Sequence, residues 1–146
     1  MKPCNLLNEK EKRVLENASL KSLTHARIYS LEYKDGLKIF AFLRLTFEAN
    51  IYLTITTGKF ADNIVFLDEL DFSNEMDKYT RQDGVDLKVS TLPDSERIVD
   101  QKLLNVECIQ KPDEEYYWQF NFHFSETTLH IGALVDELRV SLTLLN

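Results

Sequence analysis

The sequence contains few of the residues that break or cross-link a fold. Its 146 residues include four glycines, three prolines and two cysteines. Collagen-like, linker-rich and disordered chains are far richer in glycine and proline. Two cysteines are too few for a disulfide framework. Although Cys4 and Cys108 could pair, we expect two reduced thiols in a cytoplasmic protein.

Long apolar runs are also missing. The most apolar stretch, residues 37–47, is interrupted by Lys38 and Arg44. It is well short of the roughly 20 residues that span a bilayer. No apolar segment of signal-peptide length follows Lys2. We therefore expect neither a secretory signal nor a membrane partner.

The overall composition is that of a globular chain. Hydrophobic residues make up 44% and charged residues 28%, which is enough apolar material for a core. The length suits one domain over residues 1–146. Asn8 and Glu11 have the spacing of a capping box, which predicts a helix start within a helical segment over residues 1–25.

Alternation of apolar and polar residues predicts a β body over residues 26–146. Asp35-Gly36 predicts a type I′ hairpin turn, because glycine readily supplies positive φ. In the strand over 37–47, the odd-numbered residues are expected to share one face. Residues 68–84 are interpreted mainly as loop, with a short helical turn around residues 74–79 as the alternative. A helix over 133–138 is the alternative near the end of the chain. The predicted strands cover residues 28–34, 37–47, 51–56, 64–67, 85–92, 103–109, 116–124, 128–135 and 138–145.

The expected fold class follows from these strands and their short connections. It is mainly β (α+β), an antiparallel meander of about 8–9 strands with a short N-terminal helix. The meander is expected to fold as a sandwich or an open barrel. Phe120, Phe122 and Phe124 are expected to face inward, where they would either fill the core or line a ligand cavity in a small barrel.

The histidines are one candidate for chemistry. If the hairpin turn is centred on Glu126 and Thr127, His123 lies opposite His130 with β-carbons about 5 Å apart. Such a pair could share a metal, but zinc needs further ligands, and the sequence offers only loose candidates such as Glu126. Cys108 with a histidine could act as a nucleophile, but a small buried apolar group is the simpler interpretation. We expect no catalytic residue, metal or cofactor.

Other catalytic and nucleotide-binding signatures are missing. The sequence has no glycine-rich phosphate loop, dinucleotide fingerprint, paired Cys-x-x-Cys or Gly-x-Ser-x-Gly. Nucleic-acid binding needs clustered basic residues near stacking aromatics. Here the aromatic run 116–118 follows three acidic residues, so we expect no direct nucleic-acid partner.

Regional acidity is the most specific feature of the sequence. Residues 62–115 include 15 acidic and 6 basic residues, whereas the rest of the chain has 9 acidic and 11 basic. Clustered carboxylates steer basic partners, and nearby aromatics can supply affinity. Solvated loops are the alternative. The candidate partner-binding residues are Asp68, Glu69, Asp71, Phe72, Glu75, Asp77, Asp113, Glu114, Glu115 and Tyr117.

The hypothesis that follows is a non-enzymatic acidic module that binds a basic protein. A small cytosolic inhibitor, such as an immunity protein that neutralises a nuclease-like toxin, shares this profile of size, acidity and β content. The alternatives are a small-molecule-binding β-barrel and a metal-dependent enzyme using His123 and His130. A homodimer joined through an edge strand is also possible.

Overall fold

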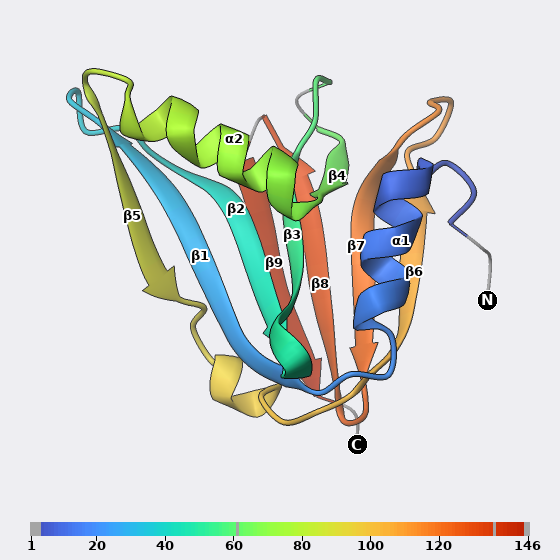
Figure 1. The fold of residues 1–146 in the computed structure, drawn as a ribbon. Coiled ribbons are helices and arrows are strands. Elements are labelled where there is room, and N and C mark those ends of the chain that lie inside the picture. The colour runs from blue at the N-terminus through green and yellow to red at the C-terminus, as the bar shows by residue number, and fades with distance from the viewer. Residues whose placement is uncertain (1–3, 61, 136, 145–146) are drawn as a thin grey trace.

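Two antiparallel sheets make up most of the molecule (Figure 1). The structure, a computed structural model, describes residues 4–60, 62–135 and 137–144. The five-stranded sheet has the order β4-β3-β2-β1-β5, and the four-stranded sheet has the order β6-β7-β8-β9. The strands are β1 (Leu23–Tyr33), β2 (Lys38–Phe47), β3 (Ile51–Thr57), β4 (Ile64–Leu67), β5 (Val85–Thr91), β6 (Leu103–Gln110), β7 (Tyr117–Phe124), β8 (Thr127–Leu134) and β9 (Glu137–Leu144).

This arrangement confirms the predicted mainly β, antiparallel fold class. Each sheet ends in edge strands, so over the described residues neither sheet closes into a barrel. The fold is a two-sheet sandwich. The last predicted strand, 138–145, corresponds to β9, although Leu145 and the first three residues of the predicted helical segment lie outside the described residues. The β body begins at Leu23, three residues earlier than expected.

The core lies between the two sheets. Phe120, Phe122 and Phe124 point inward from β7 with at most 1% of their surface exposed. Phe66 of β4 stacks on Phe120 with ring centroids 4.5 Å apart. These aromatic rings fill the space between the sheets, so the phenylalanine face does not line a ligand cavity.

Helix α2 (Glu69–Thr80) occupies most of the stretch that the sequence analysis interpreted as loop. Asp68 caps its N-terminus, because its side chain accepts a hydrogen bond from the Asp71 backbone N–H at 2.8 Å. The apolar positions Phe72, Met76 and Tyr79 recur at helical spacing and pack on the outer face of the five-stranded sheet. High charge obscured this stripe in the sequence, although its spacing was a usable signal.

Helix α1 (Glu9–Ala18) confirms the predicted helix and its capping box. Glu11 has a second role that the motif did not reveal. Its side chain is buried, with one oxygen accepting from the Asn8 backbone N–H at 3.1 Å and the other from the Phe66 backbone N–H at 3.0 Å. The carboxylate therefore ties α1 to the edge strand β4.

The β1–β2 hairpin forms where expected but with a different turn. The Gly36 N–H donates to the Tyr33 carbonyl at 3.0 Å, and Gly36 has φ 92°. Asp35 is not among the residues with positive φ, so the type I′ prediction is wrong. A type I′ turn needs positive φ at both central residues, whereas this turn places only the following glycine there.

A bulge interrupts the predicted alternation of β2. Tyr29 pairs with Phe42 and Ser30 with Phe40, which leaves Ala41 as an extra residue. Beyond the bulge Leu43, Leu45 and Phe47 face the core between the sheets, whereas Ala41 and Phe42 pack with α2. The expectation that all odd-numbered residues of this strand share one face is therefore wrong.

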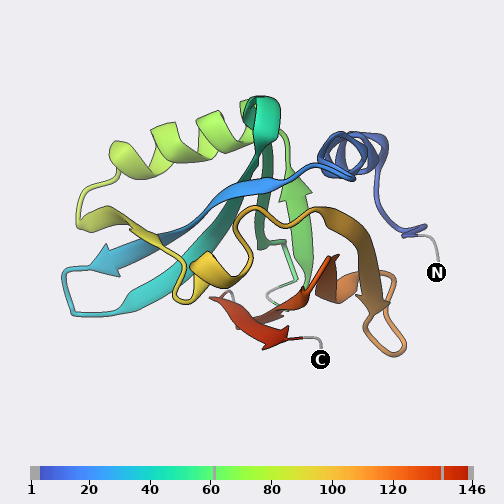
Figure 2. The ribbon, with the colours of Figure 1, turned by 90° about the horizontal axis from the view of Figure 1, so that it is seen from below.

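The two helices pack against different parts of the sandwich: α2 on the outer face of the five-stranded sheet, and α1 against the core between the sheets. Figure 2 shows α2 across the outer face of the five-stranded sheet and α1 beside it, and neither helix lies on the outer face of the four-stranded sheet. Two short 3₁₀ turns, Glu48–Asn50 and Ser95–Arg97, complete the connections. The outer face of the four-stranded sheet is therefore open to solvent or a ligand.

The buried Glu11 carboxylate gives a first prediction. Replacing Glu11 with alanine leaves the Phe66 N–H without its acceptor and removes half of the capping box, so we expect a loss of about 1–3 kcal/mol in the free energy of unfolding. Chemical denaturation followed by circular dichroism measures it. Glu16→Ala, at an exposed position of the same helix, is the matched control. Equal effects of the two substitutions would contradict the assigned role of Glu11.

Candidate functional site

The acidic residues at the start of α2 are held by basic partners. Arg44 Nη2 lies 2.7 Å from Glu69 Oε2, and Lys10 Nζ lies 3.7 Å from Asp68 and 3.4 Å from Asp71. The backbone N–H of Asp71 holds the pKa of Asp68 below its ordinary value, and the charge on Lys10 lowers it further. Much of the negative charge in this turn is thus balanced within the protein.

Further along α2, two carboxylates are free of such partners. Within the described chain, no side-chain hydrogen bond or ion pair involves Glu75 or Asp77. Leu70 is 67% exposed on the same helix, and Leu70, Asn74 and Asp77 follow one another at helical spacing. We call Glu69, Leu70, Asn74 and Asp77, all exposed, the outer stripe of α2.

The two predicted aromatic contacts lie inside the protein. Phe72 is 8% exposed and Tyr117 is 7% exposed. The Tyr117 hydroxyl accepts a hydrogen bond from the Leu6 backbone N–H at 2.9 Å, and an irregularity in the β6–β7 register turns this tyrosine inward. Phe72 packs beneath α2, whereas Tyr117 packs near Phe120 in the four-stranded sheet. The exposed apolar group of α2 is Leu70.

The second acidic segment is not close to the first. Asp113, Glu114 and Glu115 are exposed in the β6–β7 connection. Figures 1 and 2 place this connection at the end of the four-stranded sheet, whereas α2 lies across the five-stranded sheet. The fold therefore does not bring the two acidic segments together as one surface.

A polar cluster that the sequence analysis did not single out joins the two sheets near this connection. Asp62 pairs with Lys111 and accepts a hydrogen bond from the Tyr116 hydroxyl at 2.8 Å. Phe60 stacks on Tyr116 with ring centroids 5.1 Å apart. The hydrogen bond from Lys111, followed by that from Tyr116, lowers the pKa of Asp62, and the same contact with Asp62 raises the pKa of Lys111. The cluster connects the β3–β4 loop to the β6–β7 hairpin.

These pKa shifts predict how stability depends on pH. The contribution of Asp62 is present above its unfolded pKa of 3.8 and is lost as the pH falls below it. The contribution of Lys111 is present below 10.5 and is lost as the pH rises through its higher folded pKa. We expect wild type to be more stable than Asp62→Asn across the neutral range, with the difference shrinking at both extremes.

Denaturant midpoints measured for both proteins across this pH range test the prediction. Asp83→Asn, at an exposed position after α2, controls for the general loss of one charge. A stability difference between wild type and Asp62→Asn that persists at acid pH would show that the carboxylate is not the cause.

The two histidines are not opposite each other, so that prediction is wrong. Asn121 pairs with His130, and His123 pairs with Thr128. The hairpin closes through Ser125 and Glu126, one residue earlier than assumed, which shifts the pairing by two positions.

Both histidine rings are engaged in a polar network on the outer sheet face. His130 Nδ1 lies 2.8 Å from Asn121 Oδ1, and its Nε2 lies 2.9 Å from Thr143 Oγ1. His123 Nδ1 lies 3.0 Å from Thr128 Oγ1. The part of the chain that the structure describes contains no group of three residues able to hold a metal ion. The network gives the metal-dependent alternative no geometric support.

The two cysteines form a disulfide, contrary to the expected reduced thiols. Cys4 and Cys108 are bonded across 104 residues with α-carbons 5.6 Å apart. Cys108 is therefore not a free nucleophile. The bond attaches the segment before α1 to β6, a contact between distant segments that two isolated cysteines in a sequence cannot establish. Disulfides are more typical of oxidising compartments than of the cytoplasm. No helix in the described ranges is long and apolar enough to cross a membrane.

We expect the disulfide to contribute strongly to stability. Cross-linking residues this far apart restricts the unfolded chain, so reduction should lower the free energy of unfolding by about 2–5 kcal/mol. Denaturation with and without reductant measures the effect, and the double variant Cys4→Ser/Cys108→Ser should match the reduced wild type. If reductant leaves the wild-type midpoint unchanged, the bond is absent or without effect.

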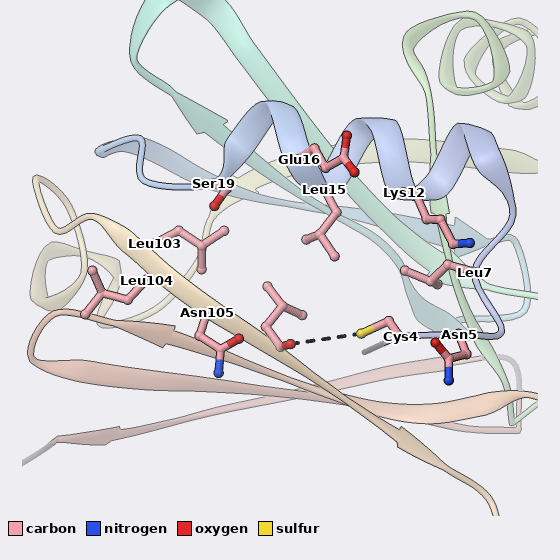
Figure 3. A pocket seen from close by; sticks show the side chains of 11 residues that line it. Cys4, Asn5, Leu7, Lys12, Leu15, Glu16, Ser19, Leu103, Leu104 and Asn105 are labelled. Carbon is pink, nitrogen blue, oxygen red and sulfur yellow. Dashed lines mark hydrogen bonds between the residues drawn. The ribbon is translucent and has the colours of Figure 1, made fainter. Parts of the chain in front are cut away.

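A groove of about 390 Å³ lies between α1 and β6 (Figure 3). Leu15 points into it from the helix, and Leu103 points into it from the strand. The disulfide-bonded Cys4 lies at one end, with its sulfur 4.0 Å from the Val106 carbonyl oxygen. The volume is within the roughly 300–1,000 Å³ of small-molecule sites. It is an apolar space that the fold leaves open outside the filled interior.

Comparison with known proteins adds no assignment. No protein-family model matches the chain, and no curated protein or solved structure matches it. The candidate surfaces therefore rest on geometry and charge alone.

Proposed function

We propose that this chain is a non-enzymatic acidic module that docks a basic partner protein on the outer stripe of α2. The observation that carries the proposal is an exposed leucine, Leu70, on the same helix face as the unpaired Asp77, with the unpaired and half-buried Glu75 at the side of that face. Leu70 is 67% exposed, and neither Asp77 nor Glu75 has a side-chain partner in the described chain. An exposed apolar group with free charge beside it combines contact area with steering.

The helix that presents this stripe is held firmly. The Arg44 guanidinium lies between the Tyr52 and Phe72 rings, with its carbon 4.1 Å and 4.2 Å from their centroids. From there it reaches Glu69, so the helix start is fixed to the sheet below. A surface that is ordered before binding loses less conformational entropy when a partner docks.

The charge balance favours a basic partner. From Asp68 to Thr80 the chain has five carboxylates and one basic residue, Lys78. Lys10 and Arg44 add two positive charges from neighbouring elements, which leaves a surplus of two negative charges. Attraction of this kind raises association rates and acts over roughly 8 Å at physiological ionic strength.

The partner class that best suits such a surface is a protein that binds nucleic acid. Its basic cleft normally holds phosphates, which carboxylates can imitate, so the module would act as an inhibitor of the immunity type against a nuclease-like protein. The cytoplasm keeps thiols reduced, so a module acting there would have to keep its fold without the Cys4–Cys108 bond. The cytoplasmic location stays a prediction.

Charge reversal tests the proposal. The double variant Glu75→Lys/Asp77→Lys changes the two carboxylates without partners, so the fold should be retained. We expect the partner captured by wild type from its own host to be basic and to bind this variant about tenfold or more weakly, mainly through slower association. Native mass spectrometry identifies the complex, and binding kinetics at several salt concentrations measure the loss.

The matched control reverses charge on the other acidic segment. Glu114→Lys/Glu115→Lys makes the same change in net charge away from α2 and should bind the partner with nearly the wild-type affinity. Equal loss in both double variants would mean that only net charge matters. An acidic partner, or unchanged binding by the α2 variant, would refute the proposal.

A further inference from the structure

Gly132, in the middle of β8, has no structural reason to be glycine. Its φ is not in the positive range that favours glycine. A β-carbon added there would meet only the Trp118 carbonyl oxygen at 3.7 Å and Gln119 Cγ at 3.8 Å, which are ordinary contacts. Glycine inside a strand weakens it and often marks a place where a ligand approaches the backbone.

The missing side chain leaves a hollow on the outer face of the four-stranded sheet. Gln119 of β7 and Arg139 of β9 are the direct neighbours of Gly132 across the two ladders. Ser141 lies one step further along β9 on the same face, opposite His130. Together with Asn121 these residues line a depression of about 260 Å³.

Three of the lining side chains are free to bind. Over residues 4–60, 62–135 and 137–144, no side-chain hydrogen bond or ion pair involves Gln119, Arg139 or Ser141. Arg139 is exposed and leaves its charge available on this face. The guanidinium, amide and hydroxyl all offer hydrogen-bond donors around the hollow.

The other wall of the hollow is already ordered. His130 is held between Asn121 and Thr143, and Asn121 Nδ2 donates to Glu107 Oε1 at 2.7 Å. These bonds fix the side chains beside the free groups. Neither helix covers this face (Figure 2), so a ligand can reach it directly.

We propose that this hollow around Gly132 binds a small hydroxylated carboxylate such as a sugar acid. The planar guanidinium of Arg139 matches the two oxygens of a carboxylate, and the Gln119 amide and Ser141 hydroxyl suit ligand hydroxyls. The missing side chain at Gly132 lets the ligand lie against the strand backbone. This site is on the opposite side of the sandwich from α2 and does not depend on the proposed docking function.

The decisive variant is Gly132→Ala. The added methyl fits the fold but occupies the hollow, so the thermal unfolding midpoint should stay equal or rise while ligand affinity falls about tenfold or more. Glucuronate is the probe, and glucose is the matched neutral sugar. Titration of ¹⁵N-labelled protein, followed at the amides of Gln119, Gly132 and Arg139, measures binding.

A second pair of variants separates the arginine from general charge. Arg139→Gln should lose glucuronate binding, whereas Arg27→Gln, at an exposed arginine of the other sheet, should retain it. The proposal is overturned if glucuronate gives no saturable shifts, or if glucose or inorganic phosphate binds equally well. It is also overturned if Gly132→Ala destabilises the protein, because the glycine would then serve the fold.

Discussion

Burial of aromatic rings between the two sheets is the constraint on which the rest of the structure depends. Phe120, Phe122 and Phe124 come from one strand and are fully covered by the facing sheet. Burying three such side chains contributes on the order of 1.5–3 kcal/mol each relative to exposure. Because the interior is filled, binding has to take place on the outer faces and edges of the sandwich.

The outer faces of the two sheets differ in how apolar they are. The five-stranded sheet has apolar residues on both sides: Phe42 faces outward by alternation with the inward Leu43, and α2 covers the outer residues through Phe72. The four-stranded sheet keeps a polar outer face of paired side chains around His130 and needs no cover. One face thus presents a charged helix, and the other presents a polar strand surface with a hollow at Gly132.

Several contacts between distant segments hold the peripheral elements on this sandwich. The buried carboxylate of Glu11 and the Cys4–Cys108 bond attach the N-terminal region to β4 and β6. Asp62 joins two loops through Lys111 and Tyr116. Lys10 connects α1 to the start of α2. These contacts attach the N-terminal region, the β3–β4 loop and the start of α2 to the rest of the fold.

Local patterns in the sequence determined the elements that depend on neighbours along the chain. The capping box at Asn8 and Glu11 and the inward face of Phe120 follow from side-chain spacing within a few residues, and both are found in the structure. The predicted alternation of β2 fails at its bulge. The regional acidity is likewise a property of the sequence. Helix α2 was anticipated only as a possible short turn over residues 74–79, although its apolar spacing was present, because dense charge resembles a solvated loop.

Contacts between distant segments were decided only by the tertiary structure. Whether Cys4 meets Cys108, which residue pairs with His130, and where the acidic segments lie depend on register and chain path. A shift of one residue in the turn after β7 was enough to separate the histidines. The hollow at Gly132 needs three strands in register before it exists. The sequence determined the elements and their faces, and only packing decided which faces meet and which remain free to bind.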